Sequence, residues 1–115
     1  MYTIDRAVVV IKPKQPFLDW VNSTEDEGDE DITLAEIQHD HSVYLVKSYE
    51  EIDGHLKVLK GVYEEIFENE LWGWCTDESL WPQKRDYATF KKWFDIEAHS
   101  LVFDLCEGDI VREEG

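Results

Sequence analysis

The chain has 115 residues, and its 27 acidic and 11 basic side chains give a formal net charge of −16. This length favours one domain, and a hydrophobic content of 43% is enough to form a core, which excludes a wholly disordered protein. The charge repels nucleic-acid phosphates and anionic membranes, so neither is an expected partner, whereas basic proteins and cations are attracted. The alternative is that the charge serves only solubility.

The predicted elements alternate between strands and helices. They are a strand at 6–12, a short helix at 15–21, a second short helix from residue 33, a strand at 42–47, a long helix from residue 48, a helix at 85–95 and a strand at 99–106. The first strand is predicted from the valine-rich run Ala7 to Ile11, which has charge and proline at its ends. The long helix is predicted from the capping box Ser48-x-x-Glu51 and from an apolar stripe that ends before Gly73.

Helices that separate strands favour an α/β fold, with a small mixed sheet of three or four strands and about four helices packed on it in two or three layers. We expect residues 1–115 to form a single domain with a mobile acidic loop at about 23–32, because six acids in the seven positions 25–31 repel one another. After a tight turn at 107–109, residues 110–111 are expected to return as a short edge strand.

The cysteines and the apolar runs favour a soluble cytoplasmic protein. Cys75 and Cys106 are far apart and form no CxxC pair, so we expect two buried, reduced thiols. The apolar runs are too short for a signal peptide or a membrane helix.

The acidic segment 25–36 is similar in its carboxylate spacing to a calcium-binding EF-hand loop. The position that requires glycine for the sharp turn holds Glu30, so the favoured interpretation is a solvated loop that binds cations weakly. The loop also supplies candidates for contact with a basic partner, namely Glu25, Asp26, Glu27 and Asp29.

Histidines are the candidate metal ligands. His39 and His41 lie on one side of an extended segment, and His99 begins the last predicted strand. If the strands after His41 and His99 are parallel neighbours, the two imidazoles share one end of the sheet, with Asp104 further along the same strand. The alternative interpretation is surface histidines without a ligand set. No cofactor is expected apart from a divalent cation at this position.

Three tryptophans lie within ten residues, and such a cluster can line a pocket, anchor a partner or form core. Trp72 is on the edge of the apolar stripe and is expected in the core. Trp74 and Trp81 flank a loop, so they are the candidates for exposure and partner binding.

No specific catalytic motif is present, since the sequence has no GxSxG, GxGxxG, Walker loop or HExxH. The leading interpretation is therefore a noncatalytic binding or regulatory protein whose acidic surface meets a basic protein partner. The alternative is a metal-dependent protein or enzyme that uses His41, His99 and Asp104 at one sheet edge. Both a monomer and a homodimer through aromatics near Trp81 are compatible with the sequence.

Several segments together resemble a family of small uncharacterised bacterial proteins. They are RAVVVIKPKQPFLDW at 6–20, Trp81-Pro82, Phe90-x-x-Trp93-Phe94 and His99-Ser100-x-Val102-x-Asp104-Leu105. The resemblance implies a single-domain cytoplasmic bacterial protein of unknown function. It implies no catalytic or binding residue.

Overall fold

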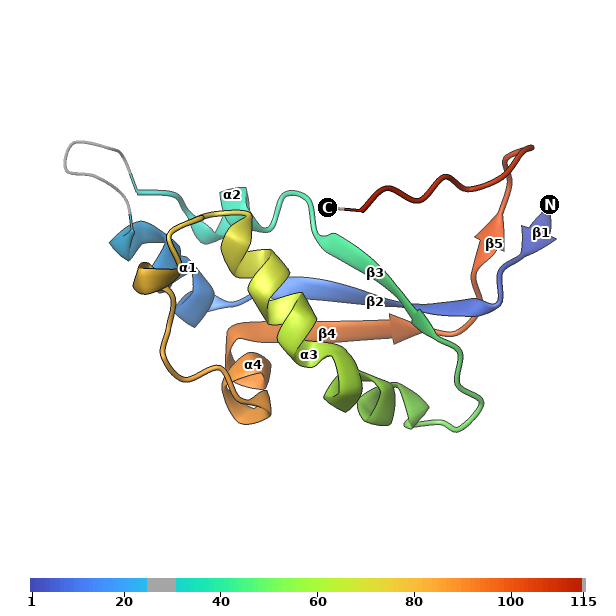
Figure 1. Cartoon of the computed structure of the whole chain (residues 1–115), viewed down its shortest axis with the longest axis horizontal. Coiled ribbons are helices and arrows are strands. Elements are labelled where there is room, and N and C mark those ends of the chain that lie inside the picture. The colour runs from blue at the N-terminus through green and yellow to red at the C-terminus, as the bar shows by residue number, and fades with distance from the viewer. Residues whose placement is uncertain (25–30, 115) are drawn as a thin grey trace.

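The computed structural model describes residues 1–24 and 31–114, and it confirms the predicted α/β class (Figure 1). The elements are β1 (Tyr2–Thr3), β2 (Arg6–Pro13), α1 (Gln15–Ser23), α2 (Leu34–Ile37), β3 (Ser42–Lys47), α3 (Gly54–Trp72), the 3-10 helix η1 (Glu78–Leu80), α4 (Tyr87–Trp93), β4 (Phe94–His99) and β5 (Phe103–Asp104). Residues 25–30, which include Glu25, Asp26, Glu27 and Asp29, make up most of the expected mobile loop and half of the EF-hand-like window, and they lie outside the described residues.

The main sheet has three strands in the order β3-β2-β4, and β2 runs antiparallel to both neighbours. Strands β1 and β5 form a separate two-stranded antiparallel ribbon beyond the N-terminal end of β2 (Figure 1). A mixed sheet was expected, but every described pair is antiparallel. The reason is the position of β2: the crossover through α3 and α4 makes β4 run in the same direction as β3, and β2 lies between them.

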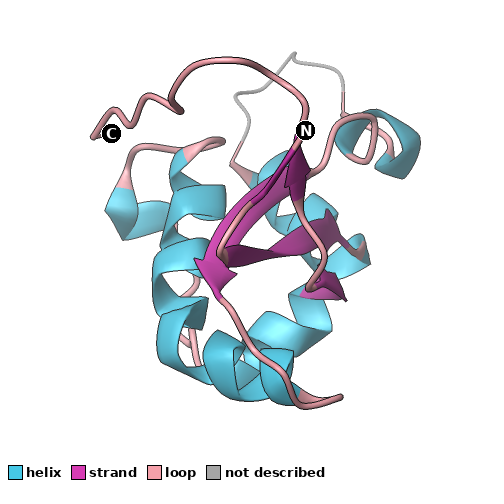
Figure 2. Cartoon of the chain, turned by 90° about the vertical axis from the view of Figure 1, so that its right-hand side faces the viewer, coloured by secondary structure: helices cyan, strands magenta, loops and turns pink. Residues whose placement is uncertain are grey.

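The two faces of the sheet differ because side chains alternate along each strand. On β2 the residues Ala7, Val9, Ile11 and Pro13 are buried, whereas their neighbours in the sequence are more exposed. Helix α3 crosses the buried face (Figure 1), and the view from the β1–β5 end shows this helix beside the strands (Figure 2).

Aromatic rings fill the core between the sheet and the helices. Phe94 at the start of β4 is 5.0 Å from the ring of Phe17 and 5.6 Å from that of Phe67, between ring centroids. These three residues and Phe90 are at most 1% exposed, and they come from α1, α3, α4 and β4. Contacts at these distances add to the burial energy, so this cluster holds α1, α3 and α4 against the sheet in one core.

The last strand of the sheet lies earlier in the chain than the sequence predicts. Residues 94–99 form β4, and the segment predicted as a strand at 99–106 contributes only His99, the last residue of β4, and the two residues of β5. The aromatic residues from Tyr87 to Phe94 are spaced as on one side of a helix, so the predicted helix runs past the true end of α4. The helix α4 ends at Trp93 instead, and Phe94, Ile96 and Ala98 then alternate with charged or polar side chains.

Helix α3 starts later than its predicted capping box. The Ser48-x-x-Glu51 pattern precedes the helix, whose first residue is Gly54. Ile52, which lies within the predicted helix, is 94% exposed and does not contribute to the apolar stripe. A Cβ at Gly54 would lie 2.7 Å from the Cβ of Tyr49, so the chain passes too close to itself there for a side chain. The predicted end is confirmed, because Gly73 follows the last helical residue.

The C-terminal segment also differs from the prediction. Residues 110–111 form no strand, and Gly108 has a φ of 91°, in the region that favours glycine. The described cysteines are free, as expected, but Cys75 is only partly buried and Cys106 is exposed.

Candidate functional site

The histidines proposed as metal ligands lie apart. Ser42 pairs with Ile11 and His99 pairs with Val8, so His41 and His99 lie near opposite ends of β2 and on opposite sides of it. They are offset by about four residues, or roughly 13 Å, along the strand direction, and the whole width of β2 lies between their strands. The expected shared sheet end is wrong because His99 ends its strand instead of beginning it. His39 is exposed after α2.

The described residues contain no group of three or more His, Cys, Asp or Glu side chains that could hold a metal ion. His41 Nε2 is buried and has no hydrogen-bond partner among these residues, but a single imidazole is not a ligand set. Asp104, the acid of the predicted cluster, lies in the ribbon and accepts a hydrogen bond from the Cys106 backbone N–H at 2.8 Å. The structure therefore does not assemble the His/Asp cluster.

Two of the three clustered tryptophans have the opposite exposure from the prediction. Trp72 is 54% exposed, whereas Trp81, the expected surface residue, is 9% exposed. Leu71 takes the core position at the end of α3, and the next residue is turned by about 100° around the helix axis, away from the core. The Trp81 indole N–H donates to the Cys75 carbonyl at 2.8 Å, which fixes its ring under the loop. Trp74 is 47% exposed, as expected.

Two adjoining hollows lie along the C-terminal half of α3, and we call them together the aromatic–acidic groove. The first, of about 550 Å³, is lined by Tyr44, Glu65, Ile66, Glu68, Asn69, Trp72, Glu78 and Trp81. The second, of about 270 Å³, is lined by Pro13, Phe17, Ile37, Asp40, Ser42, Asn69, Glu70, Trp72, Gly73 and Trp74. Trp72 and Asn69 belong to both. The described lining thus contains five carboxylates and no Lys, Arg or His.

A half-buried tyrosine in the wall of the first hollow joins β3 to α3. The Tyr44 hydroxyl donates to Glu70 Oε2 at 2.6 Å and accepts from Asn69 Nδ2 at 2.9 Å. Burial raises the pKa of the Tyr44 phenol, and the carboxylate of Glu70 adds to that rise. The phenol therefore stays neutral, and the negative charge of this wall comes from carboxylates alone.

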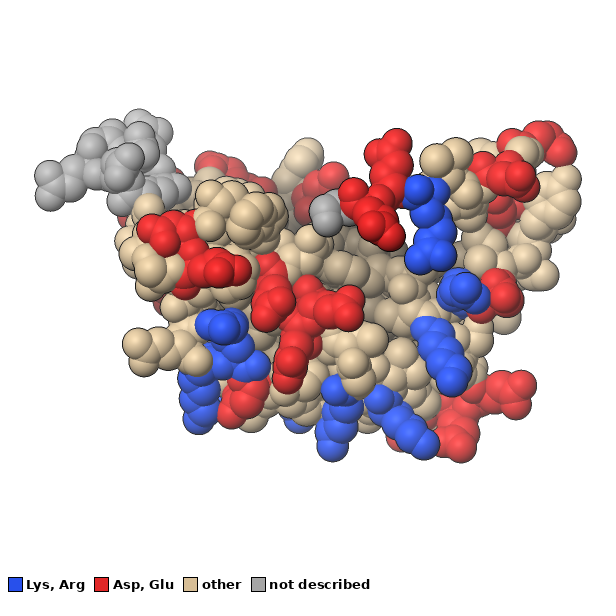
Figure 3. Space-filling model, viewed as in Figure 1, with Lys and Arg blue, Asp and Glu red and all other residues tan. Residues whose placement is uncertain are grey.

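The acids of α3 are placed against its dipole. The first half of the helix contains Lys57 and Lys60, and the second half contains Glu64, Glu65, Glu68 and Glu70. Figure 3 shows acidic side chains gathered over the C-terminal half of α3 and the segment after it, with Lys and Arg along the lower edge. Negative charge in the last turn of a helix is unfavourable. Glu70 lies in that turn, where it accepts the hydrogen bond from Tyr44, and the other three acids lie farther from the helix end.

The sequence contains a pattern that indicates the groove, and this pattern is distinct from the cluster of three tryptophans. Glu65, Glu68, Asn69 and Trp72 are spaced i, i+3, i+4 and i+7, which places them on one side of a helix beside the apolar stripe. A search for such a second, polar and aromatic stripe would have found the groove before the structure was known.

Comparisons with protein-family models, with curated proteins and with solved structures found no match to this chain, so the resemblance to a bacterial family stays a prediction. In the described part of the chain, no helix is both long and apolar enough to cross a membrane.

Proposed function

We propose that this protein is a noncatalytic binding or regulatory protein, and that its aromatic–acidic groove binds a basic segment of a protein partner. The observation that carries the proposal is the lining of the groove, where two exposed tryptophans lie among five carboxylates without a cation. Lys and Arg side chains combine an apolar stem with a cationic head. Indole rings attract both parts, and carboxylates pair with the head.

An intramolecular contact next to the groove is of the kind that the proposal requires. The guanidinium carbon of Arg85 lies 5.8 Å from the centre of the Trp81 ring, and Arg85 Nη1 donates to the Pro82 carbonyl at 2.6 Å. Arg85 also lines a smaller hollow with Glu64 and Glu68, where its charge offsets theirs in part. The carboxylates farther from Arg85 are therefore the stronger attraction for a partner's cation.

A cytoplasmic location belongs to the same proposal. The free thiols of Cys75 and Cys106 support it, because unpaired cysteines persist in reducing compartments.

The test is a titration of the whole protein with an oligo-arginine peptide, with tryptophan fluorescence as the readout. We expect saturable binding that weakens as salt rises, because exposed charges are screened. The triple variant Glu65→Gln, Glu68→Gln, Glu78→Gln should bind far more weakly than the wild type.

The matched control removes the same charge from the other end of α3, by Glu50→Gln, Glu51→Gln and Asp53→Asn, three exposed positions. Its binding should remain close to that of the wild type. If both triples weaken binding equally, net charge alone attracts the peptide, and the groove has no special role.

A further inference from the structure

Arg85 lies beside the aromatic–acidic groove and borders a third hollow next to it. This hollow, of about 220 Å³, is lined by Glu64, Glu68 and Arg85, and Glu68 also lines the first hollow of the groove. The guanidinium carbon of Arg85 lies 5.8 Å from the centre of the Trp81 ring, and Trp81 lines the first hollow too. A cation of the chain itself therefore borders both an indole and an acid of the groove.

The contacts of Arg85 hold its guanidinium in place but leave most of its hydrogen-bonding capacity free. Arg85 is half-buried, and its Nη1 donates to the Pro82 carbonyl at 2.6 Å. A guanidinium has five N–H donors, and within the described part of the chain this is the one hydrogen bond that the side chain donates. Its charge is therefore not assigned to one carboxylate and acts on both Glu64 and Glu68.

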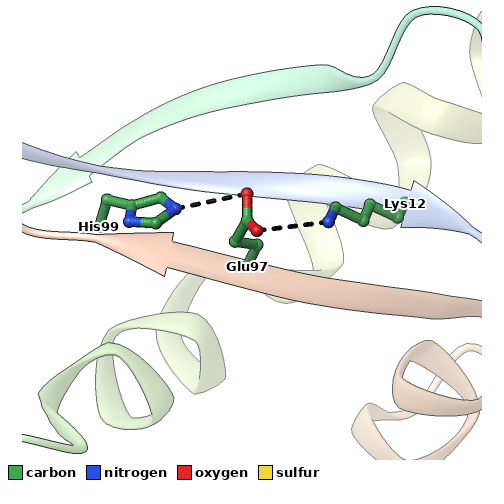
Figure 4. A network of polar contacts seen from close by, with 3 residues as sticks. All are labelled: Lys12, Glu97 and His99. Atoms are coloured by element: carbon green, nitrogen blue, oxygen red, sulfur yellow. Dashed lines mark hydrogen bonds and ion pairs between the residues drawn. The ribbon is translucent and has the colours of Figure 1, made fainter.

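Other cations of the chain are engaged away from the groove. Figure 4 shows Lys12, whose Nζ is 3.4 Å from Glu97 Oε1, and Lys14 Nζ is likewise 3.7 Å from Asp95 Oδ1. Among the residues that the structure describes, no ion pair includes Arg85 or a carboxylate of the groove. The acids of the groove thus keep their charge for a ligand, and Arg85 shares a hollow with one of them.

We infer that Arg85 is an internal competitor for the groove: it occupies one end of the acidic surface and limits the affinity for a basic segment. The inference rests on the proposed function and adds a means of regulation to it. Arg85 makes the two contacts that the groove offers a partner, a cation over an indole and a cation beside carboxylates. A partner's cation that approaches Glu68 must share that carboxylate with Arg85, and the two cations repel each other.

A purely structural role for Arg85 predicts the opposite result. Its bond to the Pro82 carbonyl lies within the segment that precedes α4, so in that case the side chain would serve to fix the turn after Trp81. Removal of Arg85 would then loosen the groove and weaken peptide binding. Removal of a competitor strengthens binding instead, so the sign of the change in affinity distinguishes the two roles.

The test is a calorimetric titration of the whole protein with the oligo-arginine peptide at low salt. Arg85→Gln should bind the peptide roughly threefold tighter than the wild type, because it removes a like charge several ångströms from the bound cation. Lys84→Gln removes the same charge from the preceding residue, whose side chain is 79% exposed and whose Nζ is 3.8 Å from Asp86 Oδ2. It should bind nearly as the wild type does, and the difference between the variants should shrink as salt rises.

Further variants tie the effect to the charge and to the shared acid. Arg85→Lys keeps the cation without the planar guanidinium, so its affinity should stay close to that of the wild type. In a Glu68→Gln background, Arg85→Gln should bring a smaller gain, because the carboxylate for which the two cations compete is gone. Circular dichroism shows whether each variant folds. Arg85→Met, which keeps the apolar stem, replaces Arg85→Gln if that variant does not.

The outcomes separate this inference from the proposed function. A peptide that binds the Arg85→Gln variant more tightly than both the wild type and Lys84→Gln supports both. If the wild type binds and Arg85→Gln binds no tighter than Lys84→Gln, the inference is overturned and the proposed function stands. If neither the wild type nor Arg85→Gln binds the peptide, the proposed function is overturned and the inference with it.

Discussion

The groove beside α3 and the face of the main sheet that points away from α3 carry charge in different ways. The groove places exposed tryptophans among five carboxylates, whereas on the other face Lys12 pairs with Glu97 and Lys14 with Asp95 beside exposed valine and leucine side chains. A net charge of −16 therefore describes the groove but not the sheet face on which the charges are paired. The comparison shows that net charge describes the chain, but the sorting of charge over elements decides which partner each surface fits.

The largest expected effect comes from the core that both surfaces share. Phe67 is fully buried and contacts Phe90, Trp93 and Phe94, so Phe67→Ala should lower the free energy of unfolding by about 3–5 kcal/mol. Chemical denaturation measures the change. Peptide binding in the groove should weaken with the fold. If binding survives unchanged, the groove does not depend on this core.

A change on the rim of the groove should weaken peptide binding while leaving the fold unchanged. Trp72→Ala removes a ring that is 54% exposed, and the loss should weaken oligo-arginine binding about tenfold with little effect on the melting temperature. Calorimetric titration gives the affinity. Trp74→Ala is the comparison variant, because that ring lines only the smaller hollow; a larger effect there would move the main contact to the second hollow.

The tyrosine that joins the sheet to the groove should show its effect in alkaline solution. Tyr44→Phe removes the hydrogen bond to Glu70 and should cost about 1 kcal/mol of unfolding free energy at neutral pH. Because burial raises the pKa of Tyr44 in the folded protein, its stabilising contribution is present below about pH 10 and is lost as the pH rises above that value.

Denaturation curves of the wild type and the Phe variant at neutral and alkaline pH test this sign. The wild type should lose more stability than the variant on going to the alkaline solution. An equal loss in both proteins would mean that other groups cause the alkaline dependence.

The smallest expected effect tests whether the groove is maintained at the expense of stability. Glu68→Gln removes an acid near the C-terminus of α3 without placing a base beside Arg85, and it should raise the free energy of unfolding by about 0.5 kcal/mol or less. The same change should weaken peptide binding. Thermal melting and the peptide titration are measured on one preparation; a variant that loses stability would show that Glu68 has a structural role instead.

The strands that bury one whole side were predictable, and those with charged outer residues were harder to recognise. The run from Ala7 to Ile11 and the segment 42–47 are rich in β-branched residues, and both formed strands at or near the predicted limits. The strand at 94–99 was missed, because Asp95, Glu97 and His99 break its apolar pattern and its first residue continues the aromatic spacing of α4.

The groove was harder to predict than the strands because it depends on tertiary placement. Sequence spacing indicated that Trp72, Trp74 and Trp81 lie close together, but not that Trp81 would bond to the Cys75 carbonyl and leave Trp72 in solvent. The histidines failed as a cluster for a related reason. His41 precedes the start of its strand, as predicted, but His99 ends its strand instead of beginning it. Strand β2 also lies between the two strands and keeps the histidines apart.

The pairing of β1 with β5 has a consequence for the order of folding. Tyr2 is opposite Asp104 and Thr3 is opposite Phe103, so this ribbon closes a loop of about a hundred residues for very few contacts. It should form last and open first, and its opening need not disturb the three-stranded sheet. The Ile4 amide, which donates to the Val102 carbonyl at 3.0 Å, should therefore exchange its hydrogen with solvent much sooner than the amide of Val9 in the central strand.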